Sequence, residues 1–445
     1  MADAGGGVAA AHRAVRIHGV VRPPGDKSIS HRVLMLAALA KGKSEFSGLL
    51  TGDDVKSSAR VLRQLGVKVS TIRDSVVQVS GSRLLAPGSR LNCGNSGTTA
   101  RLILGMLAGQ TFGATLTGDA SLRRRPMRRV TEPLKAMGAD IKERGDGLPL
   151  TIRGGKLRGL NYNSPVASAQ VKSAILLAGL TAKVPVTIRE PYRSRDHTER
   201  LFAHLGLAIH ERDGAISYQP SAISIPAFQL SVPGDPSSAA FMVGAAVLAD
   251  GGELTIENVG VNPTRTGFLV VLERMGAHVE RVNLRDEGGE PVADLVVRPG
   301  GGGGLKATEV AVAEIPTLVD EVPILAVLAS RARGKTVFRE VGELRVKESN
   351  RLELIAANLR GLGVRAEALG NDLHVEGTEK PPRGRVDTAS DHRLAMAFAV
   401  LGTAAGANVK LSEKKSVAIS YPGFFADLKR IRADSLPRAK RGVPT

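Results

Sequence analysis

The chain has 445 residues, which is long for one hydrophobic core and favours two domains. Aromatic residues make up only 3% of the chain and no apolar run approaches the roughly 20 residues that span a bilayer, which argues against a base-stacking platform and against a membrane protein. The net charge of +18 leaves two kinds of partner open: nucleic acid, or small anionic substrates drawn into a basic cleft.

The predicted elements repeat in a fixed order along the chain. A helix rich in small apolar residues and opened by polar residues is predicted six times, over residues 25–42, 94–109, 167–182, 234–251, 320–334 and 391–406. A second helix follows each of these, over residues 53–66, 125–138, 195–206, 263–276, 347–363 and 422–431. Most second helices end at a glycine, which is a helix stop signal, and short alternating β-branched runs after them predict strands.

These elements form a β-α-β-α-β-β unit of about 70 residues that is present six times. The unit predicts an α/β protein, but it does not by itself say how six copies pack. Repeats often stack into a solenoid, yet these units are longer than ordinary solenoid repeats and their charged residues gather at helix starts. The residues that mark the start of each first helix are Asp26, Asn95, Ser168, Asp235, Asp320 and Asp391.

The first two repeats carry groups suited to anions at their helix starts. A helix N-terminus presents unpaired N–H groups and a partial positive charge, so it attracts phosphate and carboxylate. Lys27 and Ser28 open the first helix, and Arg32 follows one turn later. In the next repeat Gly97 permits a ligand to approach the backbone closely. Among five arginines around residue 126, Arg125 is the best candidate for a substrate clamp because the adjoining proline fixes it at a helix start.

Later repeats add hydroxyl, amide and guanidinium groups at the same place. Ser168, Ala169 and Gln170 open the third first-type helix with groups suited to orienting a polyol. Arg195 lies in the loop that follows, and Arg393 lies at the start of the last first-type helix. If these helix starts face a common space, they form a site for phosphate and carboxylate groups.

Acidic residues appear in the fifth repeat. Asp320 and Glu321 open its first helix, where acids are common, but in a basic cleft an ionised carboxylate can also act as a general base. In the run RVKESNR the spacing predicts Lys347 and Arg351 on one helical face, and it allows an ion pair between Glu348 and Arg351. A plain surface ion pair is the alternative interpretation of Glu348.

Several kinds of chemistry are not indicated. The nine histidines lack metal-site spacing, and no nucleophile elbow or dinucleotide fingerprint follows a predicted strand. Cys93, the only cysteine, excludes an internal disulfide and is interpreted as a small buried residue.

The strings PGDKSISHR, GNSGTT, RPM, SAQVKSA, LRVKESNRL and DHRLAMA occur in this order and span most of the chain. With them the chain resembles the enolpyruvyl transferase family, and most closely the 5-enolpyruvylshikimate-3-phosphate synthases. The resemblance implies a two-domain inverted α/β prism with three repeats in each domain. It places one domain at residues 25–234 and the other at residues 1–24 plus 235–445, with a strand over about residues 15–21 in the second domain.

The same resemblance implies that the enolpyruvyl group of phosphoenolpyruvate is transferred to shikimate 3-phosphate. The residues it assigns to shikimate 3-phosphate are Lys27, Ser28, Arg32, Ser168, Ala169, Gln170, Arg195, Asp320 and Lys347. Those it assigns to phosphoenolpyruvate are Lys27, Gly97, Arg125, Gln170, Arg351 and Arg393. Asp320 is expected to be the base and Glu348 the acid, with Lys27 able to share either role. No cofactor and no metal is expected.

Two rival functions remain open at this point. A UDP-N-acetylglucosamine enolpyruvyl transferase has the same repeat and co-substrate, but it typically uses a cysteine on a mobile loop as its acid. A protein that binds or processes RNA would account for the net charge. We expect a monomer whose partners are small molecules, without nucleic acid or membrane. The N-terminus lacks a charged segment followed by an apolar one, so we also expect a cytoplasmic location.

Overall fold

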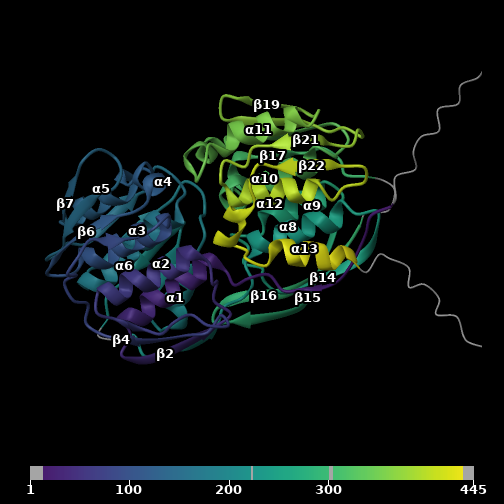
Figure 1. Cartoon of the computed structure of the whole chain (residues 1–445). Coiled ribbons are helices and arrows are strands. Elements are labelled where there is room, and N and C mark those ends of the chain that lie inside the picture. Colours follow the sequence, from purple (N-terminus) through teal and green to yellow (C-terminus); the bar gives the residue numbers. More distant parts are fainter. Residues whose placement is uncertain (1–13, 222–223, 300–303, 434–445) are drawn as a thin grey trace, which may run out of the picture.

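The computed structural model describes residues 14–221, 224–299 and 304–433, which form two lobes side by side (Figure 1). Each lobe has its own hydrophobic core. One core is built from residues between Ile29 and Val232. The other combines Ile17 and Val21 with residues between Ala239 and Ile431. The chain therefore crosses between the lobes twice, after Val21 and after Val232.

The first lobe contains three of the predicted repeats. Its helices are α1 (Lys27–Leu39), α2 (Asp53–Gln64), α3 (Gly97–Ala108), α4 (Ala120–Arg123), α5 (Arg128–Met137), α6 (Ala169–Ala182) and α7 (His197–His204). Its strands are β2 (Gly42–Ser47), β3 (Lys68–Val69), β4 (Val77–Gly81), β5 (Leu91–Asn92), β6 (Gly113–Thr117), β7 (Asp140–Glu143), β8 (Leu150–Arg153), β9 (Leu160–Asn163), β10 (Val186–Arg189), β11 (Ile209–Arg212), β12 (Ala215–Tyr218) and β13 (Gln229–Ser231).

The second lobe contains the other three repeats. Its helices are α8 (Pro236–Val247), α9 (Gly267–Arg274), α10 (Val322–Ala329), α11 (Arg351–Gly361), α12 (His392–Leu401) and α13 (Phe424–Ala433), with 3-10 helices η1 (Val312–Thr317), η2 (Gly342–Val346) and η3 (Lys415–Ile419). Its strands are β1 (Arg16–Val21), β14 (Gly251–Gly260), β15 (His278–Glu287), β16 (Glu290–Arg298), β17 (Glu309–Val310), β18 (Lys335–Phe338), β19 (Arg365–Leu369), β20 (Asp372–Glu376), β21 (Arg383–Val386) and β22 (Asn408–Leu411).

Both predicted helices of every repeat are present, so the repeat prediction is confirmed at the level of helices. The helices begin up to four residues after their predicted starts, and the largest differences are at residues 263 and 347, whose helices begin at Gly267 and Arg351. The side chain of Asn350 accepts the backbone N–H of Glu353 at 3.3 Å and so caps the helix there. Lys347 lies before this cap, directly after η2, and therefore does not share a helical face with Arg351.

Five sheets share one strand pattern, in which a parallel pair is followed by two antiparallel partners. In the first lobe α1 contacts β4, α3 contacts β6 and β8, and α6 contacts β10, so three sheets surround three buried helices. The sixth sheet, β21 with β22, holds only the parallel pair. The last repeat ends in α13 instead of a hairpin, and Phe424 of that helix is buried in the second core.

The central helices pack closely because small residues line their contacts. Helix α3 is buried along almost its whole length, which fits a helix that is apolar on all sides. A Cβ on Gly105 of α3 would lie 2.2 Å from the carbonyl oxygen of Ala174 in α6. Glycine at this position therefore lets two helix backbones touch.

The two crossings are closed by parallel strand pairs. Strand β1 pairs with β14 of the second lobe, from Arg16 opposite Gly251 to Val21 opposite Ile256. Strand β13 pairs with β2 of the first lobe. Each strand thus completes a sheet before the chain leaves for the other lobe, which places residues 24–26 and 233–235 at the junction.

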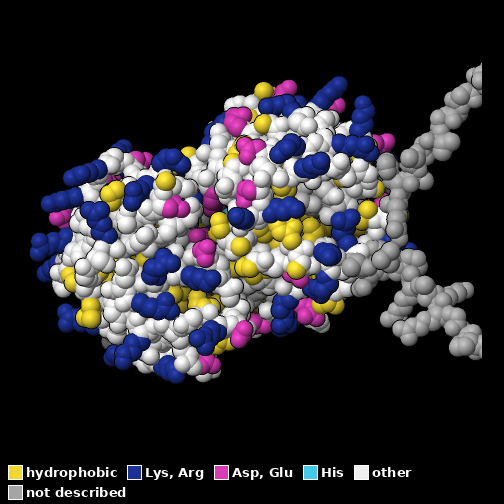
Figure 2. Space-filling model, in the orientation of Figure 1, with side chains coloured by type: hydrophobic (Ala, Val, Ile, Leu, Met, Phe, Trp, Pro, Cys, Tyr) yellow, Lys and Arg dark blue, Asp and Glu magenta, His cyan; other side chains and the backbone are white. Residues whose placement is uncertain are grey.

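On the face shown in Figure 2, Lys and Arg side chains are scattered over both lobes with Asp and Glu between them. This face presents no continuous basic stripe. Among the described residues, no helix is both long enough and apolar enough to cross a membrane.

Candidate active site

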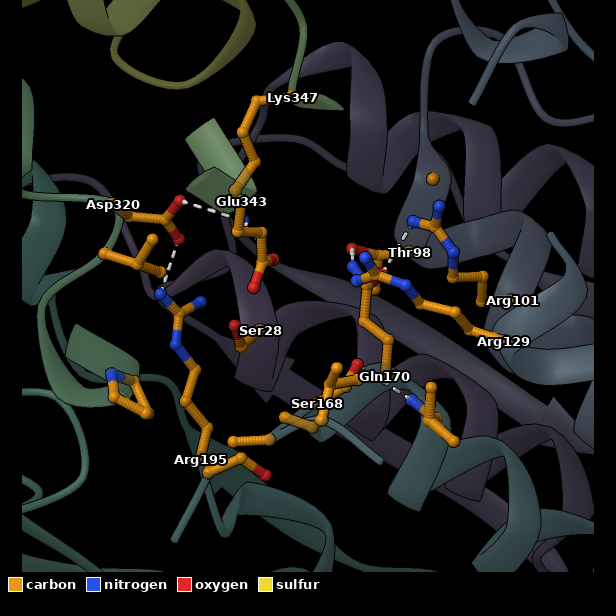
Figure 3. Close-up of a pocket in the computed structure, with 18 of the residues that line it drawn as sticks. Ser28, Thr98, Arg101, Arg129, Ser168, Gln170, Arg195, Asp320, Glu343 and Lys347 are labelled. Atoms are coloured by element: carbon orange, nitrogen blue, oxygen red, sulfur yellow. Dashed lines mark hydrogen bonds and ion pairs between the residues drawn. The ribbon is translucent and has the colours of Figure 1, made fainter. Parts of the chain in front are cut away.

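A cavity of about 590 Å³ lies between the lobes, within the usual size range of small-molecule sites. Both lobes contribute charged side chains to it (Figure 3). The predicted site residues that border it are Lys27, Ser28, Arg32, Gly97, Arg125, Ser168, Ala169, Gln170, Arg195, Asp320, Lys347, Glu348 and Arg393. Arg351 is absent from the lining because its side chain, 1% exposed, lies behind Glu348.

Helix starts supply most of this lining, as the sequence predicted. Asp26, Ser168 and Asp391 cap α1, α6 and α12 through their side chains. In the second repeat the cap of α3 is Ser96, one residue after the predicted marker, and its hydroxyl accepts from Thr99 N–H at 3.1 Å. The Ser168 hydroxyl faces the Val171 N–H at 3.5 Å, so it serves the helix as well as the cavity.

In the first lobe two cations of the lining are tied to protein groups. The Lys27 ammonium pairs with the buried carboxylate of Asp54. The Arg32 guanidinium donates to the hydroxyls of Thr198 and Ser173, both at 2.7 Å, and to the carbonyl oxygen of Ser28 at 2.9 Å. Burial lowers the pKa of Arg32 to about 10, so it remains charged at neutral pH. These contacts fix both cations at the cavity wall.

A pair of arginines lies beside the start of α3. Arg125 donates to the Asn95 side-chain oxygen at 2.6 Å. Arg101, which sequence reasoning missed, donates to Gln170 Oε1 at 2.7 Å and to the Pro126 carbonyl oxygen at 2.9 Å. Burial lowers the pKa of Arg101 to about 10, which leaves it cationic. A buried cation held in this way is a strong anion ligand.

Gly97 sits against this arginine pair. A Cβ added there would lie 2.8 Å from Nη1 of Arg101 and 3.5 Å from Nη1 of Arg125. Its φ lies outside the left-handed region, so the backbone itself does not require glycine. Guanidinium groups therefore occupy the space beside residue 97, and they fit there because glycine has no side chain.

Asp320 of the second lobe is surrounded by positive charges from both lobes. Its Oδ2 accepts from Arg195 of the first lobe at 2.5 Å, and the Lys347 ammonium lies 4.0 Å from Oδ1. Arg393 donates to its carbonyl oxygen at 3.0 Å. Burial alone would raise the pKa of Asp320, but the surrounding positive charges, those of Arg393 and Arg195 first, hold it well below 3.8. Asp320 is therefore a carboxylate at neutral pH, as the sequence predicted.

Glu348 forms the predicted ion pair with Arg351, at 2.6 Å, but it is not a surface pair. Its side chain is 23% exposed and faces the cavity, where Nη1 of Arg125 lies 3.9 Å from it. Burial would raise the pKa of Glu348, yet the positive charges of Arg351 and its neighbours hold it well below 4.5. Arg351 is itself anchored by Asp391 at 2.8 Å. Glu348 is therefore ionised at neutral pH.

Sequence reasoning missed several other residues of the cavity wall. Some of them, such as Arg101, lie inside an element, where the local sequence does not distinguish them from ordinary helix residues, and others lie at helix starts that were not assigned to a substrate. Arg101 sits within α3, and Asp54 near the start of a second-type helix. Arg129 and Glu343 face each other across the cavity from opposite lobes (Figure 3). The missed lining residues with polar side chains include Asp54, Thr98, Arg101, Arg129, Ser194, Asp235, Arg265, Glu340 and Glu343.

Cys93 is fully buried, as predicted, and burial raises its pKa to about 12. A thiol in this state is a poor proton donor for a solvent-facing reaction, which disfavours the rival that uses a loop cysteine. Within the described ranges, no group of three or more His, Cys, Asp or Glu side chains is placed to hold a metal ion.

Known proteins match this chain along nearly its whole length. The family profile of EPSP synthase (3-phosphoshikimate 1-carboxyvinyltransferase) matches residues 12–428. Two proteins named 3-phosphoshikimate 1-carboxyvinyltransferase, from a Synechococcus species and from Thermus thermophilus, are 48% and 50% identical, with 94% of this chain and 97% of each relative covered. A structure of EPSP synthase from Acinetobacter baumannii superposes with a TM-score of 0.83 at 37% identity, covering 95% of this chain and 97% of that one. The enolpyruvyl transferase NikO from Streptomyces tendae, with a TM-score of 0.74 and 20% identity, covers 94% of this chain and 96% of its own, and shares the fold.

Proposed function

This chain belongs to the EPSP synthase family, and from that membership we infer that the cavity between its lobes is where the enolpyruvyl group of phosphoenolpyruvate is transferred to the 5-hydroxyl of shikimate 3-phosphate. The reaction releases phosphate and belongs to aromatic biosynthesis. The site assignment rests on one observation: anion-binding residues of both lobes line the same cavity, which also contains the ionised carboxylates of Asp320 and Glu348.

We propose that the two substrates divide the cavity between them. Shikimate 3-phosphate is assigned to the wall formed by α1, α6 and the Arg195 loop, where hydroxyl, amide and cationic groups suit a phosphorylated polyol. The residues are Lys27, Ser28, Arg32, Ser168, Ala169, Gln170, Arg195, Asp320 and Lys347.

Phosphoenolpyruvate is assigned to the arginine-rich wall. Its phosphate and carboxylate suit planar guanidinium groups, which bind such anions through paired hydrogen bonds. The residues are Lys27, Gly97, Arg125, Gln170, Arg351 and Arg393, and the structure adds Arg101 to this set because it is buried, cationic and bonded to Gln170. Arg351 does not border the cavity and is proposed to act on it indirectly, through its ion pair with Glu348.

Asp320 is assigned the removal of the proton from the attacking hydroxyl, since it is ionised and close to Lys347. Glu348 is assigned the delivery of a proton to the methylene carbon, and Lys27 can share either role. Phosphate then leaves the tetrahedral adduct by C–O cleavage while the methyl group returns a proton to the Glu348 carboxylate, and this restores the double bond of the enolpyruvyl group. Bound phosphoenolpyruvate would offset the positive charge of Arg125 and Arg351, and this raises the pKa of Glu348 toward the protonated form that an acid requires.

We also propose residues 25–234 as one domain and residues 1–24 plus 235–445 as the other, in line with the two hydrophobic cores. The enzyme is proposed to work as a cytoplasmic monomer, independent of nucleic acid and membrane. Light scattering after size-exclusion chromatography measures the oligomeric state directly.

The functional assignment is tested by phosphate release from phosphoenolpyruvate with each of two acceptors. Shikimate 3-phosphate should support turnover, and UDP-N-acetylglucosamine should not. Turnover with UDP-N-acetylglucosamine but not with shikimate 3-phosphate would show that the chain has the rival activity instead. A gel-shift titration with short RNA should show no salt-sensitive binding at protein concentrations that saturate the enzyme assay.

A further inference from the structure

Arg265 and Arg351 are the two largest fully buried side chains of the described residues, and the substrate assignments above do not use Arg265. It lies in the loop before α9, at the junction of the lobes, and borders the cavity. Its side chain is only 2% exposed. A buried guanidinium needs opposite charges and hydrogen-bond acceptors around it, so its partners indicate what it holds in place.

Those partners are the two aspartates that follow the chain crossings. Nη1 of Arg265 donates to Asp26 Oδ2 at 2.7 Å, and Nη2 donates to Asp235 Oδ1 at 3.1 Å. Asp26 caps α1, which begins the first lobe, and Asp235 caps α8, which begins the repeats of the second lobe. One guanidinium therefore joins the helix starts at which the two lobes begin.

The second carboxylate oxygen of Asp235 extends this link to the cavity. Asp235 Oδ2 accepts the backbone N–H of Lys27 at 3.0 Å, although Lys27 belongs to the other lobe. The backbone N–H groups of Asp26 and Asp235 donate to Pro233 and Pro24 oxygens at 2.7 and 2.8 Å. Two buried carboxylates this close to each other repel unless a cation lies between them. Arg265 provides that cation and so sets the position of Lys27.

A second branch leads to Asp320. Nη2 of Arg265 also donates to the Ser237 hydroxyl at 2.9 Å, and that hydroxyl donates to the Glu321 carboxylate. Glu321 is 1% exposed and directly follows Asp320 in the chain. The link from Arg265 therefore reaches the backbone that carries Asp320.

A third branch leads to Arg195. Nη1 of Arg265 lies 3.4 Å from Nε2 of His197, whose other ring nitrogen is 2.7 Å from Glu290 Oε1. His197 is two residues after Arg195, which bridges the lobes by its bond to Asp320. The first lobe's Lys27 and Arg195 and the second lobe's Asp320 are thus all tied to one side chain.

We infer that Arg265 is a positioning residue for the transfer reaction: by joining Asp26, Asp235 and Ser237 it holds Lys27 and Asp320 in register across the junction of the lobes. The inference rests on the proposed function of the cavity. Displacing a reacting group by about 1 Å lowers the rate by roughly 10²-fold. Loss of Arg265 should therefore reduce kcat far more than it raises either KM, because Arg265 is assigned to neither substrate and most residues that are, such as Ser168 and Arg125, are not bonded to its network.

Two variants and one control test this inference. Arg265→Met removes the charge and every donor, and Arg265→Lys keeps the charge but replaces the two donor nitrogens that reach Asp26 and Asp235 with a single one. Arg331→Met is the control: Arg331 is half-buried in the same lobe and donates to the carbonyl oxygens of Thr378 and Lys380 at 2.5 and 2.8 Å, away from the cavity. For each variant we would measure kcat, both KM values and the melting temperature.

Arg265→Met should lower kcat by roughly 10²-fold with each KM changed by less than about threefold, and Arg265→Lys should recover part of kcat. Arg331→Met should lower the melting temperature while kcat stays within about twofold of wild type. Wild-type kcat in folded Arg265→Lys, or in folded Arg265→Met, would overturn the inference. So would an equal loss of kcat in the Arg331 control, which would indicate a general stability effect. Inactivity of the wild-type enzyme with shikimate 3-phosphate would instead refute the proposed function.

Discussion

Replacing Gly97 with alanine perturbs the arginine-rich wall by one methyl group. Alanine can adopt the backbone at the first position of α3, since φ there is not left-handed. The new Cβ would lie 2.8 Å from Nη1 of Arg101, closer than nonbonded atoms normally approach. That same nitrogen donates to Gln170 Oε1 at 2.7 Å, so the guanidinium must move away from its acceptor.

The size of the effect follows from the bond that is broken. A hydrogen bond to a charged group contributes about 1.5–3 kcal/mol, which corresponds to roughly 10- to 150-fold in a binding constant. The clash is with the end of a flexible side chain, so the fold itself need not change. Alanine is also favoured over glycine in a helix by about 0.5–1 kcal/mol. We therefore expect the KM for phosphoenolpyruvate to rise by roughly 10- to 150-fold with no fall in melting temperature.

The assay is steady-state phosphate release with each substrate varied in turn, together with a thermal melt. Gly105→Ala is the matched control on the same helix, because its Cβ would lie 2.2 Å from the backbone oxygen of Ala174. That variant should lower the melting temperature and affect both substrates alike. If Gly97→Ala instead destabilised the fold and raised both KM values equally, the assignment of this wall to phosphoenolpyruvate would be wrong.

Three further predictions concern the charged groups of the cavity. Asp320→Asn should leave both KM values largely intact and lower kcat by roughly 10²- to 10⁴-fold, and wild-type kcat would remove Asp320 as the base. Arg393→Lys should raise the KM for phosphoenolpyruvate more than that for shikimate 3-phosphate, since lysine keeps the charge but loses the planar fork; equal effects would contradict the division of the cavity. The depressed pKa values of Asp320 and Glu348 stabilise the fold above about pH 4, and this contribution is lost as the pH falls through the folded-state pKa values. Thermal melts from about pH 7 to about pH 3 should therefore show a steeper decline for wild type than for Asp320→Asn.

Features with a local cause could be predicted from the sequence. Helix starts such as Asp26 and Asp391 are marked by a capping residue followed by small apolar residues, and both cap their helices in the structure. The repeats then locate the remaining starts. The error at Lys347 arose because a run of polar residues looked continuous, whereas the cap at Asn350 divides it into a 3-10 helix and an α-helix.

Features with a tertiary cause could not be predicted in this way. Arg101 reaches the cavity because α3 packs against α6, and nothing in its local sequence separates it from an ordinary helix arginine. Arg265 gains its partners only when residues 26 and 235 meet at the junction. The low pKa of Asp320 likewise depends on cations from both lobes, which no single repeat contains.

The central claim concerns the fate of one phosphoryl group and can be followed by phosphorus NMR. Purified enzyme is mixed with equimolar phosphoenolpyruvate and shikimate 3-phosphate, and the signals of both substrates, inorganic phosphate and product are integrated over time. We predict that phosphoenolpyruvate disappears as inorganic phosphate and one new phosphate monoester appear in equal amounts, and that omitting shikimate 3-phosphate stops the reaction. Phosphate released without the new monoester, or no turnover of the pair, would contradict the assignment.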